Sequence, residues 1–194
     1  MSKPTRRAIE EQDGRMLERQ ATFRRAGQVV AADLAKFREV RAISLFGSVA
    51  GVLKREIPRF QPFRRFGIEI YHECGDIDLA VQLDRLDNLA ALNRARSQTV
   101  DDLFRSTGIG VAHHQVDIFL FGDSWAHYLG RLCTYGQCPK GKPACLTPGC
   151  GRKPFLKLHR DFVLEPDALA ADRAIVLYER ERDAPRGREL AGAL

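Results

Sequence analysis

The chain has 194 residues, a hydrophobic fraction of 44% and a formal net charge of +6, which indicates a folded protein with one sizeable core and excludes a disordered chain. No apolar run approaches the ~18 residues that a membrane-spanning helix needs, so we expect no membrane partner. The first residues are charged and include no apolar stretch of the signal-peptide kind, so we expect a cytoplasmic location.

Residues 5–40 carry the pattern of an amphipathic helix. Apolar side chains recur every seven residues along one side of it, at Ile9, Met16, Phe23, Val30 and Phe37. The companion positions Asp13, Gln20 and Gly27 are not apolar, which favours a helix packed on the domain over a coiled coil. We expect Gly27 to break this stretch into two helices.

The middle of the chain alternates strand and helix patterns. Strands are expected over residues 40–46, 67–71, 76–83 and 111–121, and a possible one over 174–178. A helix is expected over 86–105; its buried face would carry Leu89, Leu92, Val100, Leu103 and Phe104, and its outer face Arg94, Arg96 and Asp101. This order predicts an α/β (α+β) fold with a mixed sheet packed by helices.

Two aspartates interrupt an apolar strand in the sequence "DIDL", residues 76–79. Because side chains alternate across a strand, Asp76 and Asp78 project from one face while Ile77 and Leu79 project into the core. Asp117 is placed in the same way within "VDIF", residues 116–119. If the two strands pair, three carboxylates converge into the oxygen-ligand set that Mg²⁺ favours. The alternative is a structural role as caps or salt-bridge partners.

A turn at Gly47 and Ser48, in "LFGS" at residues 45–48, precedes these aspartates. Glycine there would let a polyphosphate approach the backbone, and the serine hydroxyl could donate to it. With its three motifs in this order, the stretch from residue 40 to 121 resembles the DNA polymerase β-type nucleotidyltransferase superfamily. The resemblance implies a polymerase β-like nucleotidyltransferase core in which Gly47 and Ser48 grip the triphosphate of a nucleotide.

The same resemblance implies roles for the three aspartates. Asp76 and Asp78 would ligate two Mg²⁺ ions, and Asp117 would join the metal that activates the attacking hydroxyl and help to deprotonate it. The implied reaction transfers a nucleoside monophosphate from an NTP, ATP being the commoner donor among such enzymes, to a hydroxyl, with release of pyrophosphate. The acceptor would be an RNA, a protein (AMPylation) or a small molecule such as an antibiotic. The alternative function is a catalytically silent nucleic-acid-binding or antitoxin-like module on the same fold.

The chain departs from that family in the length of one loop. Twenty-seven residues separate Ser48 from Asp76, where small members usually have about a dozen, and the extra length is a basic, aromatic loop over residues 51–67. Its cations would reach the triphosphate or the acceptor, unless they are simply solvated; they are Lys54, Arg55, Arg59, Arg64 and Arg65.

Four cysteines fall within eighteen residues, at Cys133, Cys138, Cys145 and Cys150, with glycine and proline between them. A loop with so little to bury needs a staple, and in a reducing compartment a structural Zn²⁺ on four thiolates is favoured over disulfides, giving a zinc-knuckle-like segment. His159 in place of one cysteine, an iron–sulfur cluster and unliganded thiols remain open. Cys74 and His72, like His113 and His114, lie near the aspartates, where a local packing role is the default.

Basic residues concentrate in the same part of the chain. From residue 124 to 160 there is no Asp or Glu, and residues 131–160 carry seven positive charges, which exceeds the whole net charge. Contact with a polyanion such as RNA and a merely solvated surface are both consistent with this pattern. We divide the chain into a helical segment (1–39), a nucleotidyltransferase core (40–122), a basic Cys-rich segment (123–165) and a C-terminal helix or strand with a tail (166–194).

Overall fold

The computed structural model describes residues 2–139, 147–159, 162–165 and 167–181. Its two helices are α1 (Arg6–Leu34) and α2 (Leu89–Thr107). Three short 3₁₀ helices follow strand ends or loops: η1 (Gly47–Val49), η2 (Arg64–Phe66) and η3 (His113–Gln115). The strands are β1 (Val40–Phe46), β2 (Arg55–Glu56), β3 (Ile70–Tyr71), β4 (Ile77–Leu83), β5 (Val116–Phe121), β6 (Tyr128–Leu132), β7 (Leu156–Lys157) and β8 (Ile175–Glu179). Neither helix in this described part is long and apolar enough to cross a membrane.

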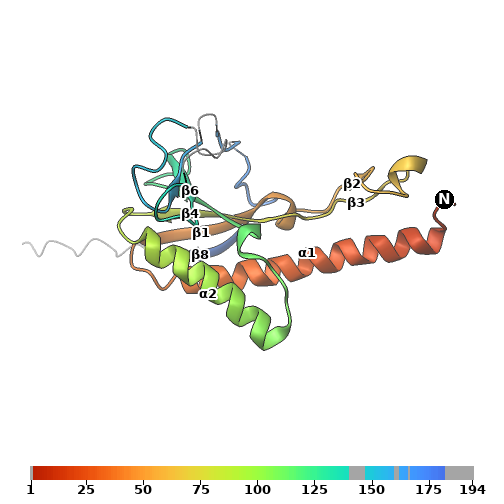
Figure 1. Ribbon diagram of the computed structural model, residues 1–194, viewed down its shortest axis with the longest axis horizontal. Helices are drawn as coiled ribbons and strands as arrows, with labels where there is room; N and C mark the ends of the chain where they lie inside the picture. The colour runs from red at the N-terminus through yellow and green to blue at the C-terminus, as the bar shows by residue number, and fades with distance from the viewer. Residues whose placement is uncertain (1, 140–146, 160–161, 166, 182–194) are drawn as a thin grey trace, which may run out of the picture.

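Six strands form one mixed sheet in the order β7-β6-β5-β4-β1-β8. Strands β4 and β5 are parallel, and every other neighbouring pair is antiparallel. Helices α1 and α2 lie against one face of this sheet (Figure 1). The predicted mixed sheet packed by helices is therefore confirmed, and the possible strand at 174–178 is confirmed as β8, which pairs with β1.

Because side chains alternate across each strand, the sheet contributes to two hydrophobic clusters of unequal size, one on each face. Beneath the sheet, Leu45, Ile77, Leu79 and Ile118 join the buried residues of the two helices in the larger cluster. Above it, a smaller aromatic cluster surrounds Phe46, Ala80, Phe121 and Ala174, with Phe119, Tyr128 and Phe162 packed against it. Asp78 and Asp117 alternate with the lower set and therefore lie on the upper face, away from the helices.

The expected break at Gly27 is wrong, because α1 is continuous from Arg6 to Leu34. Gly27 is buried where the helix crosses the sheet, and a Cβ there would lie 3.2 Å from Ile77 Cγ2 and 3.4 Å from Leu45 Cδ1. The glycine thus serves close packing of helix on sheet. Its lower helix propensity, about 1 kcal/mol relative to alanine, is not enough to end a helix held by burial on this scale.

The three residues of α1 whose types disfavour a coiled coil lie on the side of the helix that contacts the rest of the protein. Asp13, Gln20 and Gly27 are spaced by seven residues, so they lie along one side of the helix. Asp13 Oδ1 accepts from the Tyr71 backbone N at 2.8 Å, and Gln20 Nε2 donates to the carbonyl of Ser48 at 2.9 Å. Helix α1 therefore contacts the β3 hairpin, the turn after β1 and the sheet in succession.

The loop expected over residues 51–67 contains structure of its own. Strands β2 and β3 pair in a separate two-stranded sheet, and η2 lies between them. This hairpin extends beyond the main sheet and runs beside the N-terminal half of α1 (Figure 1). We call residues 54–71 the basic arm.

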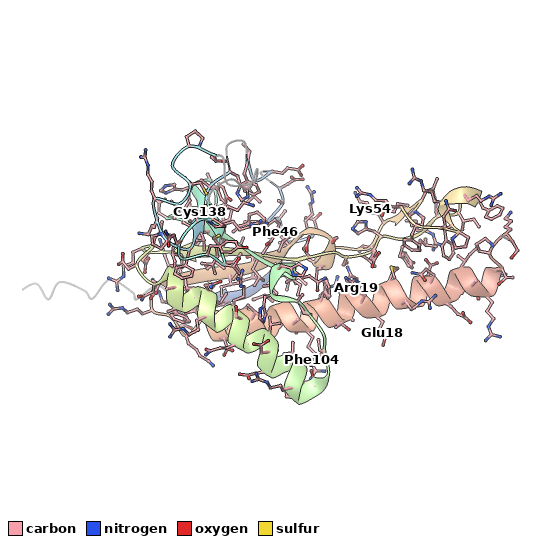
Figure 2. The ribbon with its side chains drawn as sticks, in the orientation of Figure 1. Glu18, Arg19, Phe46, Lys54, Phe104 and Cys138 are labelled. Atoms are coloured by element: carbon pink, nitrogen blue, oxygen red, sulfur yellow. The ribbon has the colours of Figure 1, made fainter. Side chains whose placement is uncertain are left out.

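Several details of the expected helix and strands differ from the structure. Helix α2 buries Leu89, Leu92, Val100 and Leu103 as predicted, but Arg96 is buried and Phe104 is 59% exposed, pointing away from the sheet (Figure 2). Only the part of 111–121 from Val116 onward is a strand, since His113–Gln115 form η3. Strand β6 was not predicted. Its central residue, Gly130, interrupts the run of strand-forming residues in the sequence and has a φ of 141° in the structure.

Candidate active site

The parallel register of β4 and β5 pairs Asp78 directly with Asp117. The expected pairing of the two strands is confirmed, and it places both carboxylates on the face opposite the helices. Asp76 precedes β4, is exposed, and lines the same cavity as Asp78. Two of the three predicted carboxylates, Asp78 and Asp117, are thus direct neighbours, and the third lines a cavity together with Asp78.

Gly47 lies directly against one of these carboxylates. Phe46 pairs with Asp78 in the antiparallel register of β1 and β4, so the turn after β1 begins beside the carboxylate. Gly47 has a φ of 75°, a conformation that side chains strongly disfavour, and a Cβ at this position would lie 2.6 Å from Asp78 Oδ2. Only glycine permits both this turn and this approach.

Burial and like charge oppose the ionisation of Asp78. The pKa of Asp78 is raised to about 6, mainly by burial and then by the neighbouring charges of Asp117 and Asp76, while the Arg131 cation lowers it by less. The pKa of Asp117 is also raised, mainly by burial, while Arg131 opposes the rise. Such a site favours the arrival of a cation, which relieves the repulsion between carboxylates.

Arg131 is a residue of this site that the sequence analysis did not identify. It projects from β6, pairs with Phe119 in register, and donates from Nη1 to Asp117 Oδ2. The two side chains are 25% and 21% exposed, so the pair is partly shielded from water. Because β6 was not predicted, the sequence offered no reason to expect Arg131 on a strand next to the one that carries Asp117.

Arg96 adds a second cation from below the sheet. It is only 3% exposed, and it donates to the carbonyl of Val116 at 3.4 Å and to Asn93 Oδ1 at 2.6 Å. Its Nε has no hydrogen-bond partner among the residues that the structure describes, and its charge lowers the pKa of Asp117. The strand that carries Asp117 therefore has a cation on each side of the sheet, Arg131 and Arg96.

Polar residues of α1 brace the turn after β1. Gln20 Nε2 also donates to the Gly51 carbonyl at 2.8 Å. Arg24 donates from Nε to the carbonyl of Val49 at 2.6 Å and from Nη2 to that of Ala50 at 2.9 Å. These bonds fix the turn that contains Gly47 and Ser48, and they come from helix positions that an amphipathic pattern assigns to solvent.

Two cavities meet at the turn. One of about 680 Å³ is lined by Phe46, Gly47, Lys54 and Phe162, and one of about 480 Å³ by Asp76 and Asp78. Ser48 and His72 line both. Each volume lies within the range of about 300–1,000 Å³ that small-molecule sites occupy. The predicted phosphate-binding residues therefore lie between two hollows, each large enough for a ligand.

The other residues near the aspartates have structural partners. Cys74 is fully buried, and burial raises the pKa of its thiol. His72 Nδ1 lies 2.8 Å from Glu56 Oε1, and His113 Nε2 lies 2.9 Å from Asp101 Oδ1 on α2. His114 is exposed. Local packing roles for these residues fit the contacts that they make.

Three of the four cysteines of the predicted zinc segment are described, and Cys145 lies outside the described residues. A Cβ on Gly151 would lie 2.8 Å from Cys138 Cβ, so the neighbourhoods of Cys138 and Cys150 adjoin. His159 Nδ1 is 2.9 Å from the hydroxyl of Tyr128. Across the described ranges, no three His, Cys, Asp or Glu side chains are grouped closely enough to hold a metal ion as they stand.

The comparisons with known proteins add no relative. No protein-family model, no curated protein and no solved structure matches this chain. Its function must therefore be argued from its own residues.

Gly47→Ala is expected to destabilise the protein more than the same change at Gly67. Both glycines have positive φ, which costs an alanine about 1–2 kcal/mol, but a Cβ on Gly67 would meet nothing within 4 Å. A Cβ on Gly47 would push the Asp78 carboxylate toward its acidic neighbours, so we expect at least about 1 kcal/mol of further loss in urea unfolding. Equal losses at the two positions would contradict the packing of Gly47 on Asp78.

Asp78→Asn is expected to stabilise the metal-free protein above pH 6. The folded-state pKa of Asp78, about 6, exceeds the ordinary aspartate pKa of 3.8, so ionised Asp78 destabilises the fold. The gain is at most about 3 kcal/mol at pH 8, declines as the pH falls through 6, and is absent near pH 4. Unfolding midpoints between pH 4 and pH 8 measure it, with Asp172→Asn, an exposed aspartate, as the control. A gain that does not change with pH would contradict this account of the site.

Proposed function

We propose that the chain is a Mg²⁺-dependent nucleotidyltransferase that transfers a nucleoside monophosphate from an NTP to a hydroxyl, with release of pyrophosphate. The observation that supports this most strongly is the approach of Asp78 to Gly47, with Asp117 beside it in the parallel register. A phosphate chain bound on the Gly47–Ser48 turn would lie next to a pair of carboxylates. Phosphate and carboxylate repel each other unless a cation lies between them.

The chemistry of the donor set fits Mg²⁺, although in the described residues these carboxylates are not grouped closely enough, as they stand, to hold the ion. Asp76, Asp78 and Asp117 offer carboxylate oxygens, the ligands that this cation prefers, and burial together with the neighbouring carboxylates raises the pKa of Asp78. When bound there, Mg²⁺ would neutralise charge on the nucleotide phosphates and on the attacking and leaving oxygens. Asp117 would accept the proton of the attacking hydroxyl.

The larger cavity is suited to the nucleotide. Gly47 exposes backbone to a phosphate, and the Ser48 hydroxyl can donate to it. Lys54 is exposed at the mouth of this cavity, where the chain leaves the sheet for the basic arm (Figure 2). Phe46 and Phe162 provide aromatic surface for a base, and Phe162 stacks on Phe119 with ring centroids 5.0 Å apart. The cavity thus joins phosphate-binding and base-binding surfaces; nothing in it selects ATP over other NTPs.

A catalytically silent nucleic-acid-binding or antitoxin-like module is the second candidate. The observation that favours it is the ion pair of Arg131 with Asp117, which neutralises this carboxylate without a metal. In an enzyme the same pair would open, or would share Asp117 with the cation. The two functions differ in whether any acceptor becomes labelled.

Label transfer distinguishes them. With Mg²⁺ and each of four α-labelled NTPs, the wild-type protein is expected to label RNA, protein or an aminoglycoside. Asp76→Asn and Asp117→Asn are each expected to lower the rate at least about 100-fold, because each removes a carboxylate that would help to hold the Mg²⁺ that the transition state needs. Asp87→Asn, on the exposed turn after β4, is the control and should leave the rate unchanged. Absence of labelling together with tight RNA binding would support the silent module instead.

We also propose that Cys133, Cys138, Cys145 and Cys150 bind one structural Zn²⁺ under the reducing conditions of a cytoplasm. The adjoining neighbourhoods of Cys138 and Cys150 support this. Elemental analysis of the purified protein is expected to give about one zinc per chain, and Cys138→Ser should lower that content together with the melting temperature. A protein without zinc that melts at the same temperature after this change would refute the proposal.

A further inference from the structure

The basic arm is held rigidly against α1. Asp13 accepts from the Tyr71 backbone and pairs with Arg55 at 2.8 Å, and the Arg55 guanidinium lies 4.9 Å from the centre of the Tyr71 ring. Phe63 and Ile70 are buried at 6% and 1% exposure. Because these contacts tie both strands of the hairpin to the helix, the surface that the arm presents is organised before any ligand arrives.

Ion pairs inside the arm and at its base engage most of the local carboxylates. Asp13 pairs with Arg55, Glu56 with His72, and Glu73 with Arg19. In the fully described segment 51–73, Glu69 is the one carboxylate without an ion pair. Most carboxylates near the arm therefore have partners other than the arginines at its end, Arg59, Arg64 and Arg65.

The cations at the end of the arm have no such partners. Arg59, Arg64 and Arg65 are exposed, and no carboxylate of the described residues lies within ion-pair distance of them. Aromatic rings are interleaved with these cations: Phe60 follows Arg59, and the Arg65 guanidinium lies 5.8 Å from the centre of the Phe66 ring. Both rings are partly exposed. Cations alternating with accessible rings match a chain that alternates phosphates and bases.

The arm and the carboxylates share one cavity. The cavity of about 480 Å³ is lined by Arg59 and Phe60 of the arm and also by Asp76 and Asp78. A chain bound along the arm can therefore place its end beside the proposed metal-binding carboxylates. The Cys-rich segment offers no such path in the described residues: none of its side chains lines this cavity, and Cys138 lies at the opposite end of the molecule from the arm (Figure 2).

We propose that the basic arm is the acceptor-binding surface, that the acceptor is a single-stranded nucleic acid, and that its terminal hydroxyl enters the cavity beside Asp76 and Asp78. This inference rests on the proposed function and names its acceptor. In the transfer, the terminal oxygen forms a bond to the α-phosphorus of the NTP, and the bond from that phosphorus to the bridging oxygen breaks. Pyrophosphate leaves with the bonding electrons, and the hydroxyl proton passes through Asp117 to water.

Binding measurements test the arm without relying on catalysis. Fluorescence anisotropy with labelled single-stranded RNA and DNA 20-mers gives Kd between 50 and 300 mM KCl, and the strand that binds more tightly identifies the acceptor. We expect Arg59→Glu/Arg64→Glu/Arg65→Glu to weaken binding at least about 10-fold at 100 mM salt. We also expect the slope of log Kd against log salt to fall by about 2, since three phosphate contacts are lost.

A matched variant controls for net charge. Arg38→Glu/Arg85→Glu/Arg94→Glu changes the charge equally on exposed residues that precede β1, follow β4 or lie on α2, and it should leave Kd within about threefold. Arg152→Glu/Lys153→Glu, in the Cys-rich segment, should do the same. The triple arginine variant of the arm and its matched control should both retain the wild-type unfolding midpoint, because the substituted side chains are exposed.

Three results would overturn the inference. They are a Kd unaffected by the arm variant, a greater loss in the Arg152/Lys153 variant, and competition by polyglutamate as effective as competition by nucleic acid of equal charge. Loss of nucleic-acid binding in the arm variant would support the inference even if no transfer occurs. Normal transfer to an acceptor other than nucleic acid would instead refute the role of the arm in acceptor binding. The proposed nucleotidyltransferase activity would still hold.

Discussion

Two carboxylates face the same side of two parallel strands, at positions that the sheet register makes direct neighbours. Asp78 and Asp117 cannot both ionise in this partly buried position without opposing charge, and the surrounding structure supplies that charge only in part. Arg131 engages Asp117 from the neighbouring strand, whereas Asp78 packs against Gly47 with no cation of its own in the described residues. The arrangement is therefore electrostatically incomplete on the Asp78 side, next to the turn that we propose binds phosphate.

Helix α1 relates the parts of this site to one another. Its contact side holds the arm through Asp13, the Gly47–Ser48 turn through Gln20, and the core of the sheet through Gly27. These three contacts lie along one straight helix, so the position of the arm relative to the carboxylates is fixed by helix geometry. In the proposed enzyme, this geometry would set the distance between the acceptor surface and the reacting groups.

The sequence predicted those features that depend on local alternation. Asp78 and Asp117 each interrupt an apolar strand, and this period of two correctly placed them on the face opposite the core. The break at Gly27 was predicted wrongly, because local propensity does not register the close packing of the helix on the sheet, where a Cβ on Gly27 would lie 3.2 Å from Ile77 Cγ2.

Residues that act through long-range polar contacts left no such signal. Arg24 and Arg131 occupy positions that fit a solvent-facing pattern, and their partners lie 25 and 14 residues away in sequence. Arg96 was assigned to the outer face of α2 because charge alone predicts exposure, although the structure buries it beneath β5. Residues 51–67 were expected to be a loop, since the two-residue strand β2 is too short to show periodicity, whereas β3 lies within the strand that the sequence predicted.

The central claim is that Asp78 and Asp117, beside the Gly47 turn, hold a divalent cation together with a nucleotide. Mn²⁺ reports this directly, because electron paramagnetic resonance distinguishes free from bound ion in the presence of a non-hydrolysable NTP analogue. The account predicts Mn²⁺ binding that requires the nucleotide, is displaced by Mg²⁺, and is lost in Asp78→Asn. Nucleotide-dependent binding that persists in this variant, or no bound Mn²⁺ in the wild-type protein, would contradict it.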